Sequence, residues 1–88
     1  MNYMVSISFV QGKQDAIAAG MAAEQARVRE LTEQGAIQSL SIAADRSHIW
    51  LVMQGESQDH IQQALVSLPL YPYMHLELMP LLDLAPFR

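Results

Sequence analysis

Glu24 is the side chain in this sequence with the best placement for moving a proton. It lies within residues 14–34, a stretch of good helix formers. Apolar residues recur along this stretch at helical spacing and share one arc with Glu24: Ile17, Met21, Val28 and Leu31. A carboxylate on the sheet-facing side of a helix loses solvent, which raises its pKa toward the range where it shuttles protons near neutrality. Glu24 is therefore the catalytic candidate.

A structural role for Glu24 is the alternative. The carboxylate would then lie at the end of the packed stripe, in water or paired with an arginine such as Arg27 or Arg46. The two interpretations differ in one feature that a structure reveals, because only the catalytic one needs Glu24 to face an enclosed pocket.

A second group of polar and aromatic side chains comes from the predicted strands and is the candidate substrate-binding set: Tyr3, His48, Trp50, Tyr73, His75 and Glu77. His75 and Glu77 are two residues apart, so they share one strand face, beside Ser6 and Ser8 of the predicted neighbour. A carboxylate can orient an imidazole, and hydroxyl groups can hold the oxygen atoms of a ligand. The alternative is a set of satisfied polar groups within a subunit interface.

Metal and thiol chemistry find little support in the sequence. The three histidines, His48, His60 and His75, show none of the paired spacing that metal ligands use, and there is no cysteine. We expect no metal, no disulfide and no thiolate nucleophile.

The elements that must position these side chains follow from periodicity and turn residues. Alternating or β-rich runs predict strands, and Ala-, Glu- and Gln-rich runs predict helices, in the order βαββαβ: residues 3–10, 14–34, 36–44, 48–54, 58–67 and 73–79. Right-handed crossovers place both helices on one face of a four-stranded antiparallel sheet with strand order 4-1-3-2. The sequence thus predicts an α+β, ferredoxin-like split βαβ fold.

Residues 68–74 read Leu-Pro-Leu-Tyr-Pro-Tyr-Met and are the least generic stretch of the chain. Two prolines three residues apart cannot lie inside a helix, and each favours extended geometry in the residue before it. This stretch should end the second helix and lead the chain into the fourth strand, with Pro80 closing that strand.

Size and composition predict one domain, residues 1–88, that associates with copies of itself. The chain is 51% hydrophobic and 16% charged, which is more apolar material than so small a domain buries alone. The sheet face away from the helices carries large apolar side chains: Met4, Val10, Trp50, Val52, Tyr73 and Met79. We expect a face-to-face homodimer, an α/β barrel, with the apolar tail 81–88 docking on a neighbouring subunit.

The charge balance excludes two classes of partner. The net charge is −4 with five Lys and Arg residues, so there is no basic cluster for nucleic acid or for an anionic membrane. No apolar run reaches the roughly 20 residues that span a bilayer, and no signal peptide is evident. A cytoplasmic location is the expectation.

Residues 68–74 resemble the Leu-Pro-Leu-Phe-Pro-Tyr-Met signature of the muconolactone isomerase family, with Glu24, Gly35 and Glu77 at supporting positions. The resemblance spans residues 1–82. It implies ferredoxin-like dimers that assemble into a ring. It also implies isomerisation of a small unsaturated lactone by proton transfer, without metal or cofactor, in aromatic catabolism. The family usually carries a lysine where this chain has Met21 and an aspartate where it has His75, so we expect an altered substrate.

Three functions remain open at this point. The first is a cofactor-free isomerase for a small, mostly apolar lactone or carbonyl compound, with Glu24 moving the proton. The second is a small-ligand-binding or purely structural homo-oligomer without catalysis. The third, by analogy of fold alone, is a cofactor-free monooxygenase.

Overall fold

The computed structural model describes residues 1–82. Its elements follow in chain order: β1 (Asn2–Phe9), α1 (Gln14–Glu33), β2 (Ile37–Ile42), β3 (Ile49–Gln54), α2 (Gln58–Val66), a 3-10 turn (Tyr71–Tyr73) and β4 (Met74–Leu81). The predicted βαββαβ order is confirmed over this part of the chain. No helix within it is both long and apolar enough to cross a bilayer.

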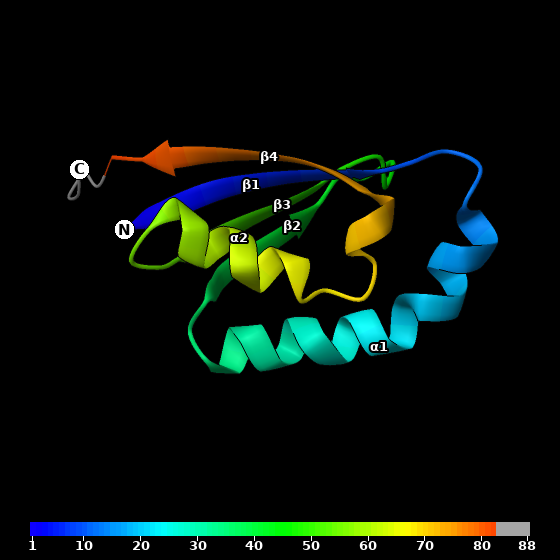
Figure 1. Ribbon diagram of the computed structural model, residues 1–88. Coiled ribbons are helices and arrows are strands. Elements are labelled where there is room, and N and C mark those ends of the chain that lie inside the picture. Colours follow the sequence, from blue (N-terminus) through cyan, green and yellow to red (C-terminus); the bar gives the residue numbers. More distant parts are fainter. Residues whose placement is uncertain (83–88) are drawn as a thin grey trace.

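The four strands form one antiparallel sheet in the order β2-β3-β1-β4, as predicted. Both helices lie on the same side of this sheet, and β1 (blue) runs between β3 and β4 (Figure 1). Val5 at the centre of β1 is flanked by Leu51 of β3 and Leu78 of β4. The chain therefore has the ferredoxin-like α+β fold that its sequence predicted.

The core lies between the helices and one face of the sheet. Alternate residues of β1 point into it, so Tyr3, Val5 and Ile7 are buried, while α2 contributes Ile61 and Leu65. Burying an aliphatic side chain of this size contributes about 1.5–3 kcal/mol, which makes this layer the main source of stability. The helix α2 begins where predicted, because the Ser57 hydroxyl accepts a hydrogen bond from the His60 amide at 3.2 Å.

A bulge in β2 decides which of its side chains face the helices. The pairing of β2 with β3 shifts between Ile37 and Ser39, so one extra residue, Gln38, enters the strand. Ile37 before the bulge and Leu40 and Ile42 after it consequently all face the helix side, opposite Met53, Leu51 and Ile49 of β3. Leu40 and Ile42 nevertheless stay exposed, which shows that α1 leaves this part of β2 uncovered.

Two details of the sequence prediction need correction. The fourth strand begins at Met74, because Tyr71–Tyr73 form a 3-10 turn in which Tyr73 precedes the strand. Pro80 continues the strand and pairs with Tyr3; an edge strand tolerates proline because its outer N–H groups have no ladder partner. The predicted tail 81–88 overlaps β4 at Leu81, and its residues 83–88 lie outside the described part of the chain.

Candidate functional site

Glu24 is buried between α1 and the sheet with 8% of its surface exposed. Its Oε1 accepts a hydrogen bond from the backbone amide of Leu70 at 2.9 Å. Neither of the two candidate arginines pairs with it. Arg27 instead donates to the Ser67 hydroxyl at 3.0 Å and approaches Glu30 at 3.9 Å. The solvated and the arginine-paired alternatives for Glu24 are therefore not what the structure shows.

Glu24 lines a cavity of about 220 Å³ between α1, the sheet and the turn that follows α2. Apart from Glu24 and Gln25, every lining side chain is apolar: Ile7, Phe9, Met21, Val28, Leu40, Ile42, Ile49, Leu51, Leu68, Leu70 and Met74. Met21, Leu40 and Ile42 are exposed to solvent, so the cavity opens between the middle of α1 and β2. The described lining contains a single ionisable group, the carboxyl of Glu24.

Burial raises the pKa of the Glu24 carboxyl above its ordinary value, because an ionised carboxylate loses solvation in apolar surroundings. The Leu70 amide acts in the opposite direction, since its hydrogen bond stabilises the ionised form, but the desolvation effect is the larger. A carboxyl in this state accepts and returns protons closer to neutral pH than an exposed glutamate does.

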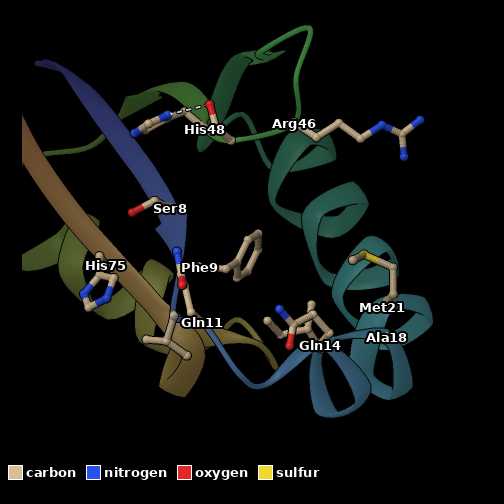
Figure 2. A pocket seen from close by; sticks show the side chains of 12 residues that line it. Ser8, Phe9, Gln11, Gln14, Ala18, Met21, Arg46, His48 and His75 are labelled. Atoms are coloured by element: carbon tan, nitrogen blue, oxygen red, sulfur yellow. Dashed lines mark hydrogen bonds between the residues drawn. The ribbon is translucent and has the colours of Figure 1, made fainter.

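A wider groove of about 940 Å³ adjoins the cavity at the end of the sheet and shares Phe9 and Met21 with it. In Figure 2 the Phe9 ring points from β1 toward α1, whereas Ser8 and His75 point to the other side of the sheet. Arg46, at the tip of the β2–β3 hairpin, lines this groove with its side chain directed outward (Figure 2). The groove thus reaches from the sheet face covered by the helices to the opposite face, which carries Ser8 and His75 and is the open face of the sheet.

Four of the predicted binding residues share that open face: His48, Trp50, His75 and Glu77. Ser6 is flanked by Trp50 on β3 and Glu77 on β4, and the His48 and Trp50 rings stack with centroids 5.7 Å apart. A hollow of about 490 Å³ lies over this face, with Ser6 and Ser8 in its lining. The sequence grouped these side chains correctly, but the sheet separates them from Glu24.

Tyr3 and Tyr73 belong to neither group in the structure. Tyr3 is a buried core residue whose hydroxyl lies 3.5 Å from the Met1 sulfur, at the end of β1 far from Phe9. Tyr73 is half-buried in the 3-10 turn, where its carbonyl accepts the Val10 amide at 2.8 Å. Neither tyrosine lines the cavity or the open-face hollow.

Several residues around Glu24 were missed by the sequence reasoning. Gln25 is the one other polar side chain of the described lining, and Leu40 and Ile42 were treated as ordinary strand residues. A signal did exist for the latter two, since both are large and apolar on the strand at the sheet edge. Nothing in the sequence indicated the hydrogen bond from the Leu70 amide to Glu24, because every residue except proline carries a backbone N–H.

No cluster of three or more His, Asp or Glu side chains suited to a metal ion occurs within residues 1–82. The polar side chains in the described lining of the cavity are the Glu24 carboxyl and the Gln25 amide. Together they suit proton transfer to or from a bound organic molecule.

Comparison with known proteins places this geometry in context. The family profile described as muconolactone delta-isomerase matches residues 1–84. Among solved structures, a crystal structure of muconolactone isomerase superposes with a TM-score of 0.81 at 22% identity, covering 100% of this chain and 96% of that one. Comparison with curated protein sequences gave no match.

A second similar structure is 5-chloro-2-hydroxyhydroquinone dehydrochlorinase (TftG) from Burkholderia phenoliruptrix AC1100, in complex with 2,5-dihydroxybenzoquinone. Its TM-score is 0.74 at 17% identity, covering 92% of this chain and 93% of that one. At these identities both structures establish the fold. The family follows from the profile, which covers nearly the whole sequence: this chain belongs to the muconolactone delta-isomerase family.

Proposed function

We propose that this protein isomerises a small lactone or carbonyl compound by cofactor-free proton transfer, with Glu24 as the group that carries the proton. One observation carries the proposal: a buried carboxyl with a raised pKa lines an apolar cavity that opens to solvent. Moving a proton between two carbons of one molecule needs a single base held close to both. Membership of the muconolactone delta-isomerase family supports the same reaction class.

The steps balance without any co-reactant. The ionised Glu24 removes a proton from the carbon between the double bond and the carbonyl of a β,γ-unsaturated lactone, which leaves a dienolate. The protonated Glu24 then returns that proton to the carbon at the far end of the dienolate. The double bond moves into conjugation with the carbonyl, and the carboxylate is restored.

The lining favours an uncharged substrate. A carboxylate on the ligand would face Glu24 with no cation in the described lining to balance it. An apolar cavity of about 150 Å³ in another protein binds benzene, so about 220 Å³ suits one substituted five- or six-membered ring. The similar dehydrochlorinase, solved with 2,5-dihydroxybenzoquinone, supports a ligand of this size.

The test uses two five-membered lactones. α-Angelica lactone is neutral and β,γ-unsaturated, whereas muconolactone carries a carboxylate and is already conjugated, so the same proton transfer runs on it in the reverse direction. Conversion is followed by ultraviolet absorbance, which reports whether the double bond is conjugated. The unaltered protein should convert the neutral lactone faster than the charged one. Glu24→Gln should abolish conversion, whereas Glu30→Gln, an exposed change on the same helix, should leave it intact.

Two other results would assign another function. Binding of the neutral lactone with no conversion by the unaltered protein would favour a ligand-binding protein without catalysis. Oxygen consumption with an electron-rich hydroquinone, unaffected by Glu24→Gln, would favour a monooxygenase.

We also propose a homodimer that forms through the open face of the sheet. Trp50 and Met79 on this face expose 39% and 64% of their surfaces, which are large fractions for such side chains. Val52 lies beside Met4 and adds to the same apolar surface. A second copy laid face to face would bury this surface and enclose His75 and Glu77.

A further inference from the structure

The turn after α2 holds its own shape through backbone hydrogen bonds. The Tyr71 amide donates to the Leu68 carbonyl at 3.0 Å, and the Tyr73 amide donates to the Leu70 carbonyl at 2.9 Å. Pro69 and Pro72 fix two of the backbone φ angles in between. The Leu70 amide is not used in either bond, and this leaves it free to donate to Glu24.

Gly20 allows this turn to approach α1. A Cβ atom at Gly20 would lie 2.7 Å from the Cδ2 atom of Leu70, closer than real side-chain contacts permit. Leu70 is buried and the contacted atom is the end of its side chain, so a larger residue at position 20 would push this leucine toward the cavity that it lines. Gly20 precedes Glu24 by four residues and therefore lies on the same face of the helix, one turn earlier. The leucine side chain thus packs on the helix beside the carboxylate that its amide binds.

The consequence for Glu24 is an asymmetric carboxylate. Oε1 is held by the Leu70 amide, and no other hydrogen bond to this carboxylate occurs within residues 1–82. Both Glu24 and Leu70 line the cavity, so the second oxygen is the one left for a ligand. Removal of the Leu70 N–H would release Oε1 and leave the carboxylate without a fixed orientation.

We infer that Leu70 is a positioning residue, whose amide, brought onto α1 by the absence of a side chain at Gly20, orients Glu24 toward the cavity. The importance of this for catalysis rests on the proposed function, but the contact itself does not. The competing interpretation is that the turn simply packs on α1 and that the Leu70 amide has no effect on the Glu24 carboxylate. Measuring protonation of Glu24 separates the two, because loss of packing alone would not change it in a defined direction.

The test replaces single amides by esters, which removes an N–H and keeps the side chain. Leu70 is exchanged for 2-hydroxy-4-methylpentanoic acid by nonsense suppression. The matched control places the corresponding hydroxy acid at Tyr71, whose amide belongs to the same turn but donates to Leu68. Glutamate labelled with carbon-13 in the side-chain carboxyl reports the pKa of Glu24 by NMR, with Glu24→Gln identifying the resonance.

The ester at position 70 should shift the pKa of Glu24 upward, because it removes a donor that stabilises the ionised form. The ester at position 71 should leave this pKa where it is in the unaltered protein. Gly20→Ala should also raise it, by a smaller amount, since the added methyl group pushes Leu70 away from the helix. Equal pKa values in the two ester variants, or a downward shift in the first, would overturn the inference.

The pKa measurement tests the role of Leu70 separately from the proposed isomerase activity. The pKa is measured without a substrate, so a shift in a protein that converts no lactone would retain the positioning role and reject the isomerase. Conversely, an unshifted pKa in a protein whose conversion depends on Glu24 would retain the isomerase and reject the role of Leu70. If the ester at position 70 prevents folding, Gly20→Ala decides the question.

Discussion

The backbone amide of Leu70 and the carboxylate of Glu24 lie 2.9 Å apart, although 46 residues separate them in the chain. This bond joins the most distinctive stretch of the sequence to the one ionisable group in the described lining of the cavity. The proline-rich turn therefore does more than end α2 and begin β4. It also forms part of the cavity opposite α1, because Leu68 and Leu70 belong to the lining.

Protein stability should decrease as the pH rises through the pKa of Glu24. Burial raises this pKa in the folded protein, so the folded state binds the proton more tightly than the unfolded state. Stability from this group is complete below the ordinary glutamate pKa and is lost above the raised one. Each unit between the two values contributes about 1.4 kcal/mol. Urea unfolding at a series of pH values measures the decrease.

Glu24→Gln serves as the comparison for this prediction. It cannot ionise, so it should lack this part of the pH dependence and become the more stable protein above the folded pKa. Glu30→Gln, at an exposed position of the same helix, should follow the unaltered protein. Parallel curves for Glu24→Gln and the unaltered protein would show that the pKa of Glu24 is not raised.

Gly20→Ala should destabilise the protein by about 1 kcal/mol in urea unfolding. Alanine is favoured over glycine within a helix by about 1 kcal/mol, but a Cβ at 2.7 Å from Leu70 overpacks the contact, which typically costs about 1–3 kcal/mol. Ala22→Gly measures the intrinsic preference for alanine over glycine at an exposed position of the same helix. If Gly20→Ala stabilises by as much as Ala22→Gly destabilises, the close contact carries no energy.

Met21→Lys should improve binding of a lactone that has a carboxylate. Met21 lines the cavity at its open side, so a lysine there would add a positive charge to a lining that has none among residues 1–82. An attraction of about 1 kcal/mol at this exposed position corresponds to roughly a fivefold lower Kd. Calorimetry with muconolactone at low and high salt should show a gain that salt weakens. Ala22→Lys adds the same charge outside the lining, and an equal gain there would contradict the prediction.

Trp50→Asp should convert the protein from a dimer to a monomer in light scattering at micromolar concentration. The change places a charge at the centre of the open sheet face, where Trp50 stacks on His48. Val66→Asp, on the exposed side of α2, should leave the dimer intact. A monomeric unaltered protein would refute the proposed assembly directly.

The fold was predictable because its signals are local and agree with one another. Alternation along residues 3–10 predicted β1, and runs of helix-forming residues predicted both helices. In the structure Ser57 caps α2, and Gly35, at φ +83°, follows the end of α1. Crossover handedness then fixed the strand order. The start of β4 was misplaced because extended geometry and a 3-10 turn are both compatible with the prolines around Tyr73.

The site was only partly predictable, for physical reasons. Helical periodicity places Glu24 on the inner face of α1, but burial depends on what covers that face, and here it is a turn 46 residues away. Strand parity grouped His75 with Glu77 correctly. It could not show that Tyr3 is a core residue, since an aromatic ring on the inner face serves either a cavity or a core. Volume and opening of a cavity are properties of the packed structure.

Proton NMR in deuterium oxide tests the central claim most directly. Uptake of deuterium at the acidic carbon of α-angelica lactone reports proton removal even when no net isomerisation accumulates. The unaltered protein should accelerate this uptake well above the buffer rate, and Glu24→Gln should return it to that rate. Uptake at the buffer rate with the unaltered protein, or equally fast uptake with Glu24→Gln, would contradict the assignment of Glu24 as the proton carrier.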